Sequence, residues 1–90
     1  MSHQGQDNAQ IIPLGQVGLQ EKAVIFTVDD LEKSDPISRR LRELGFVEGE
    51  SVKLMSRAPF GGDPIMVQIG FGKFALRLGE ANRIKVTVHR

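Results

Sequence analysis

The stretch that decides the fold runs from residue 51 to residue 89, SVKLMSRAPFGGDPIMVQIGFGKFALRLGEANRIKVTVH. Apolar and polar residues alternate in four short segments of it, the two-residue period of strands with one buried face. The apolar positions are Val52 and Leu54, then Ile65, Val67 and Ile69, then Phe74, Leu76 and Leu78, and last Ile84, Val86 and Val88. Four such segments predict a small antiparallel sheet that closes on itself.

The joints between these segments carry residues suited to turns. Residues 58–64 form a loop that begins and ends near a proline and contains Gly61 and Gly62, which are both free to take positive φ. Residues 70–72 are a hairpin corner, and residues 79–82 are a single turn before the last strand. The four segments are therefore expected to follow one another as antiparallel neighbours.

Upstream, residues 22–28 (KAVIFTV) are rich in β-branched residues and predict a further strand. A helix is expected to begin at Pro36, capped by Ser34 or Asp35, and to end at Gly45. Its apolar stripe is Ile37, Leu41 and Leu44. The sequence thus predicts a mainly β protein, a small five-stranded SH3-like barrel with one short α-helix between the first two strands.

The N-terminal part is less regular. Residues 1–10 are polar without periodicity and predict a disordered tail, so that the folded domain covers residues 11–90. Leu14 and Val17, three residues apart, predict one short helical turn packed on the core. The acidic stretch 29–35 is expected to be a solvated loop.

The length and composition of the chain exclude several classes of function. The chain has 90 residues, enough for one domain, and it contains no cysteine, which removes thiolate metal sites, thiol nucleophiles and disulfides. A small domain without disulfides fits a reducing cytoplasmic setting. No apolar run approaches the roughly 20 residues of a membrane span, so no direct membrane insertion is expected.

The charge is almost balanced, with 12 Lys and Arg against 11 Asp and Glu. This balance argues against a dedicated nucleic-acid binder. The total hides an asymmetry, because residues 1–50 hold 5 basic and 9 acidic side chains, whereas residues 51–90 hold 7 basic and 2 acidic ones. Such a charge separation can orient a docking partner.

Catalytic constellations are absent from the pattern. The two histidines are His3 in the tail and His89 one residue from the end, and both are poorly placed for a rigid catalytic triad. Neither glycine-rich loop carries the Lys-Ser/Thr of a phosphate-binding loop. We therefore expect no enzyme activity and no cofactor, and we consider His3 and His89 only as candidates for adventitious metal binding.

Three stretches together resemble the FeoA family: RLRELGF at 40–46 with Gly49, APFGGDPI at 58–65, and ALR at 75–77 with Glu80 and Ala81. The resemblance runs from about residue 14 to residue 86 and departs at Gln20, where the family usually carries glycine. It implies an SH3-like barrel and a small cytosolic protein of bacterial ferrous iron transport. Proteins of this family are thought to act on the cytosolic part of the membrane GTPase FeoB.

The leading hypothesis is therefore a non-enzymatic regulator that docks onto a FeoB-like transporter and forms at most a weak homo-oligomer. The expected partner-binding residues are Leu44, Gly45 and Phe46 at the helix end, Pro59 and Phe60 at a hairpin tip, and Arg77. For Phe46, an exposed anchor and a buried core position both remain open. The alternatives are a metal-sensing regulatory domain and an RNA-contacting barrel that uses outward lysines and arginines.

Overall fold

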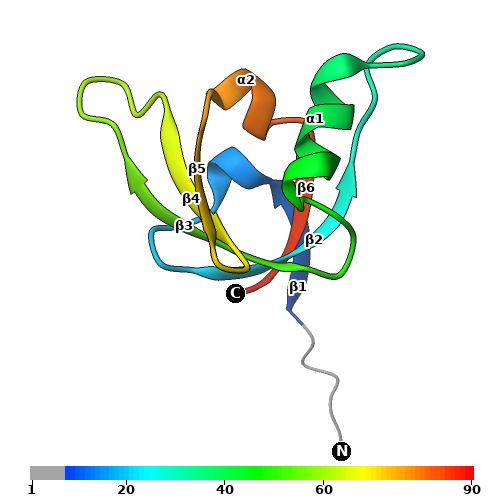
Figure 1. Cartoon of the computed structure of the whole chain (residues 1–90). Coiled ribbons are helices and arrows are strands. Elements are labelled where there is room, and N and C mark those ends of the chain that lie inside the picture. Colours follow the sequence, from blue (N-terminus) through cyan, green and yellow to red (C-terminus); the bar gives the residue numbers. More distant parts are fainter. Residues whose placement is uncertain (1–7) are drawn as a thin grey trace, which may run out of the picture.

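Six antiparallel strands form one sheet in the order β1-β6-β2-β3-β4-β5 in the computed structural model, which describes residues 8–90 (Figure 1). The strands are β1 Ala9–Pro13, β2 Lys22–Val28, β3 Ser51–Arg57, β4 Ile65–Ile69, β5 Gly72–Leu76 and β6 Ile84–His89. The helical elements are the 3-10 turn η1 Leu14–Gln16 and the α-helices α1 Pro36–Leu44 and α2 Leu78–Ala81. The sheet curls around the core, and α1 and α2 lie at the same end of it (Figure 1).

The prediction of five strands, with the helix between the first two, is wrong because β1 was missed. In β1, Ile11 pairs with Thr87 and Ile12 with Val86 of β6, so α1 lies between the second and third strands. This edge strand is mostly exposed and ends at Pro13, so it lacks the alternation that marks the other strands. It begins at Ala9, inside the predicted tail. Residues 1–7 of that tail lie outside the described part of the chain.

The prediction for α1 is confirmed at both ends. Asp35 is the N-cap, and its carboxylate accepts hydrogen bonds from the N–H groups of Ile37 and Ser38. Gly45 ends the helix with a left-handed φ of 115°. Leu41, in the middle of the predicted stripe, is fully buried. Local sequence signals were sufficient to predict α1 because the N-cap residue, the apolar stripe and the C-terminal glycine all indicate the same helix.

Strand β5 ends earlier than its alternation suggests. Leu78, predicted on the inner face of this strand, is instead the first residue of α2. The carboxylate of Glu80 accepts from the Arg77 N–H at 3.1 Å, and Asp63 accepts from the Leu78 N–H at 3.1 Å. Two carboxylates therefore satisfy amides at the start of this single turn. Asp63 therefore connects the loop between β3 and β4 to α2.

The turn after η1 shows how Gln20 is tolerated at a position where glycine was expected. This residue has a φ of 63°, a left-handed conformation that favours glycine. Its backbone N–H donates to Leu54 O at 2.8 Å, and its side-chain amide donates to Met55 O at 3.3 Å. These bonds to β3 offset the conformational cost of a side chain at this position.

One hydrophobic core fills the barrel, and Phe46 belongs to it. The Phe46 side chain is 0% exposed and meets Phe74 edge-on, with ring centroids 6.0 Å apart. Of the two possibilities left open for Phe46, the structure therefore shows the buried one. The expectation that its ring contacts a partner is corrected, because no part of that ring reaches the surface.

Replacing Phe46 with alanine is expected to lower the free energy of unfolding by about 3–5 kcal/mol, because the deletion leaves a cavity in the core. Denaturant unfolding measures this loss. The matched control is Phe71→Ala, since the Phe71 side chain is 105% exposed, and its expected effect is within about 0.5 kcal/mol. Equal losses in the two variants would contradict the buried position of Phe46.

Candidate functional site

The loop between β3 and β4 carries the most exposed of the predicted contact residues. Phe60 is 101% exposed, and Pro59 beside it is also exposed. Figure 1 shows this loop projecting from the body of the barrel, apart from α1. Gly61 and Gly62 adopt φ values of 105° and 73°, as the sequence predicts. The loop therefore presents an aromatic ring to solvent at its tip.

Phe60 itself has a φ of 62°. A non-glycine residue in this left-handed region costs on the order of 1–3 kcal/mol. No contact of its ring with the described chain offsets that cost, because the side chain is fully exposed. Strained residues of this kind cluster at active and binding sites, and they persist where the surrounding structure fixes the backbone.

The end of α1 contributes less surface than expected. Leu44 and Gly45 are partly buried and Phe46 fully so, whereas Val47, which the sequence analysis did not select, is 42% exposed. Val47 lines a hollow of about 410 Å³ beside the end of the helix, together with Arg42 and Glu48. The helix end and the β3–β4 loop are thus two separate parts of the surface (Figure 1).

Arg77 lies exposed between β5 and α2, close to the base of the β3–β4 loop. The hydrogen bond from the Leu78 N–H to Asp63 joins these two segments. Glu80 of α2 also forms an ion pair with Arg40 of α1. Arg77 can therefore belong to one contact surface with the tip of that loop.

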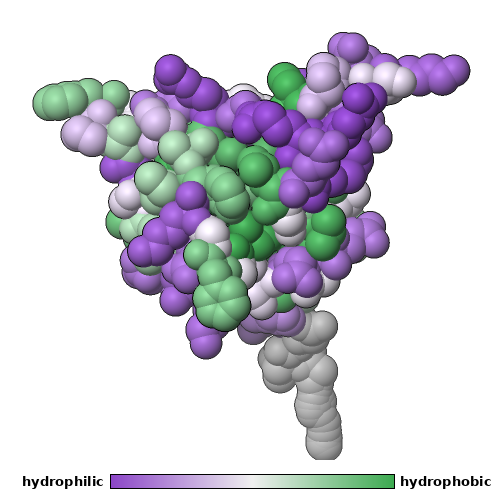
Figure 2. All heavy atoms as spheres, viewed as in Figure 1, coloured by the Kyte–Doolittle hydropathy of each residue, from purple (hydrophilic) through white to green (hydrophobic). Residues whose placement is uncertain are grey.

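The structure also exposes apolar side chains that sequence reasoning missed. Phe71, at the corner between β4 and β5, is fully exposed. Partly buried Leu44, Phe74 and Leu78 pack against the core from outside. Figure 2 shows hydrophobic side chains gathered in the centre of the face seen in Figure 1. A ring between two hairpin glycines was the available sequence signal for Phe71, since such corners project into solvent.

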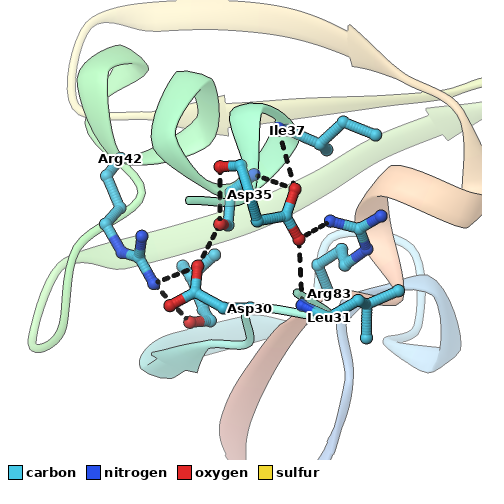
Figure 3. Close-up of polar contacts among 8 residues, drawn as sticks. Asp30, Leu31, Asp35, Ile37, Arg42 and Arg83 are labelled. Atoms are coloured by element: carbon cyan, nitrogen blue, oxygen red, sulfur yellow. Dashed lines mark hydrogen bonds and ion pairs between the residues drawn. The ribbon is translucent and has the colours of Figure 1, made fainter. Parts of the chain in front are cut away.

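The acidic stretch 29–35 is not the fully solvated loop that was expected, because Asp35 is only 4% exposed (Figure 3). One carboxylate oxygen accepts from the Ile37 N–H at 3.0 Å and from the Ser38 N–H at 3.4 Å. The other accepts from the Leu31 N–H at 2.9 Å and pairs with the Arg83 guanidinium. Asp35 therefore joins the loop, α1 and the residue before β6.

Asp30 forms the outer part of the same network (Figure 3). The Ser38 hydroxyl donates to its carboxylate, and Arg42 donates both to Asp30 at 3.2 Å and to the Val28 carbonyl at 2.8 Å. The Ser38 bond and then Arg42 lower the pKa of Asp30. The Leu31 N–H and then Arg83 hold the pKa of Asp35 well below its usual range. The carboxylates thus serve to anchor the loop.

The histidines form no metal centre within the described residues. His89 lies exposed at the end of β6, and His3 lies outside residues 8–90. Over residues 8–90, no group of three or more His, Cys, Asp or Glu side chains could hold a metal ion. In the same part of the chain, no helix is long and apolar enough to cross a membrane.

The curled antiparallel sheet with short helices at one end is an SH3-like barrel. The crystal structure of Stenotrophomonas maltophilia FeoA complexed with zinc, described as a prokaryotic SH3 domain protein, shares the fold with a TM-score of 0.75. It is 51% identical, and the match covers 81% of this chain and 86% of that one. A family model of the FeoA domain matches residues 12–88. The chain belongs to the FeoA family, which is associated with ferrous iron transport.

Other solved structures are similar. An FeoA-like protein from Clostridium acetobutylicum is 28% identical, with a TM-score of 0.76 over 88% of this chain and 87% of that one. IdeR from T. acidophilum is 20% identical, with a TM-score of 0.70 over 87% of this chain and 34% of that one, a likeness of fold alone. Among curated proteins, none matches the chain.

The lowered native pKa of Asp35 predicts a loss of stability in acid. Its contribution is complete above the unfolded pKa of about 4 and is lost as the pH falls toward the native value, because the unfolded state then binds more protons. The free energy of unfolding should therefore fall between about pH 5 and pH 2. The slope of this fall gives the number of protons taken up on unfolding, and this number should be smaller by about one in Asp35→Asn.

Urea unfolding at a series of pH values measures that slope. Asp30→Asn is the control, since the Asp30 side chain is 52% exposed and its lowered pKa should contribute a smaller slope. If wild type and Asp35→Asn had the same slope, the assigned role of the Asp35 carboxylate would be wrong.

Proposed function

We propose that this protein is a non-enzymatic, cytoplasmic accessory protein of bacterial ferrous iron uptake. In this proposal it binds the cytosolic part of a FeoB-like transporter GTPase through the β3–β4 loop. The single observation that carries the proposal is the fully exposed Phe60 ring, held at positive φ on a projecting loop. The relative from S. maltophilia has been put forward as a ferrous iron transport activating factor, which agrees with this role.

The energetics of an exposed ring favour a binding role. A phenylalanine buries about 150–250 Å² when a partner covers it, and each Å² of apolar area contributes about 25 cal/mol. A covered Phe60 ring would therefore contribute a few kcal/mol to binding. Pro59 limits the freedom of the loop, so less entropy is lost on binding.

We assign the contact surface to Pro59, Phe60 and Arg77, which lie at the tip and base of one loop. Leu44 and Gly45 form a second, smaller contact at the end of α1, where Val47 adds exposed apolar area. Phe46 has a supporting role, because it packs beneath this helix end. Charged residues are the minority in this set, as in the centres of protein interfaces.

Removal of the Phe60 ring is expected to weaken binding to the transporter's cytosolic domain at least about tenfold, as for a central aromatic anchor. Calorimetric titration against the domain in both nucleotide states measures this. Leu31→Ala is the control, since Leu31 is 69% exposed but lies in the loop before α1. The absence of binding at high micromolar concentration in either nucleotide state would refute the proposed partner.

Salt is expected to slow association with that domain more than it speeds dissociation. The charge separation between residues 1–50 and 51–90 orients the approaching partner at long range, whereas the apolar contact at Phe60 governs dissociation. Stopped-flow rates at about 50 and 500 mM salt test this. A larger effect on the dissociation rate would exclude electrostatic steering.

A further inference from the structure

A groove of about 470 Å³ crosses the outer face of the sheet, and no residue of the β3–β4 loop lines it. Its walls come from four adjacent strands, β6, β2, β3 and β4. The polar lining consists of Lys22, Ser51, Lys53, Gln68, Thr87 and His89. None of the residues that line this groove is acidic, and none is Phe, Tyr or Trp.

The strand register places the basic side chains in one row. Lys22 pairs directly with Lys53, and Lys53 pairs with Gln68. Val24 pairs with Thr87, so His89 follows on the other side of Lys22. Neighbouring strands are about 4.8 Å apart. The row therefore holds two ammonium groups and an amide at closely spaced positions across the sheet.

This arrangement is costly in the isolated chain. Like charges directly opposite each other on a sheet are destabilising. Within residues 8–90, the ion pairs and side-chain hydrogen bonds involve neither the Lys22 nor the Lys53 ammonium group. A ligand that brings negative charge to the groove would remove the repulsion between them and gain two charge-assisted contacts.

We propose that this groove binds an extended, acidic segment of a protein partner, with alternate carboxylates on Lys22 and Lys53. Alternate side chains of an extended segment point to one side about 6.6 Å apart, which two flexible lysine side chains can follow. Gln68, Ser51 and Thr87 supply neutral hydrogen-bonding groups beside them. This proposal rests on the proposed function only in taking the partner to be a protein.

The lining favours a peptide over a nucleic acid. Single-stranded nucleic acids bind to grooves that combine cations with several aromatic rings for base stacking, and this groove has no Phe, Tyr or Trp ring and only the imidazole of His89. A carboxylate-bearing segment needs only the cations and hydrogen-bond donors that are present.

The test uses the full chain and a labelled nine-residue peptide in which glutamate alternates with threonine and valine, at low salt. We expect amide shifts at Lys22, Lys53, Gln68 and Thr87 in heteronuclear spectra. The double variant Lys22→Gln/Lys53→Gln should weaken binding at least about tenfold, as expected when two charge-assisted contacts are lost.

The matched control is Lys33→Gln/Arg39→Gln, which removes the same charge from two exposed cations outside the groove and outside the row of strand-paired residues. Equal weakening in the control pair, equal binding of a glutamine-substituted peptide, shifts confined to other strands, or no binding at millimolar peptide would each overturn the proposal. Tighter binding of a single-stranded RNA of equal length at the same amides would assign the groove to nucleic acid instead.

The two proposals fail separately in this design. Phe60→Ala should leave peptide binding unchanged, because Phe60 does not line the groove. If the peptide bound but the transporter domain did not, the proposed partner would be refuted and the proposed role of the groove would stand. If that domain bound through Phe60 but the peptide did not bind, the proposed role of the groove would be refuted and the proposed partner would stand.

Discussion

The buried carboxylate of Asp35 is the interaction on which the arrangement of the helix over the barrel depends. A buried charge is stable only when it is paired and hydrogen-bonded, and here the partners come from the Leu31 N–H, the first turn of α1 and Arg83 before β6. Its position fixes where α1 begins. The helix in turn places Leu41 and the following Phe46 in the core.

The proposed contact surfaces are made of side chains that are not part of the hydrophobic core. Inward residues of the strands form the buried core, so loops and the outer face of the sheet are the surfaces left for a partner. Phe60 on the projecting loop offers apolar area, and the row of Lys22 and Lys53 offers charge. Buried apolar area mainly raises the affinity of a complex, whereas charge mainly sets the orientation and the selectivity of binding. Together, the two proposals give this small domain two different kinds of contact on separate surfaces.

Local sequence signals predicted most of the fold. Helix α1 and strands β2, β3, β4 and β6 were found because caps, terminators and alternation are properties of neighbouring residues. Strand β1 was missed because its stability comes from pairing with β6, more than seventy residues away in the chain. Helix α2 was missed because Asp63, from another loop, bonds the amide that begins it.

For the site, the sequence by itself determined that Phe60 and Pro59 lie on a turn, since the two glycines after them permit the positive φ values that tight turns use. It also determined that a chain without cysteine, with both histidines near its ends, has little chemistry to offer. Only the tertiary structure decided that Phe46 is buried while Phe60 is exposed, and that Lys22 and Lys53 face each other. Burial and cross-strand register depend on contacts between distant segments, which no local pattern of residues specifies.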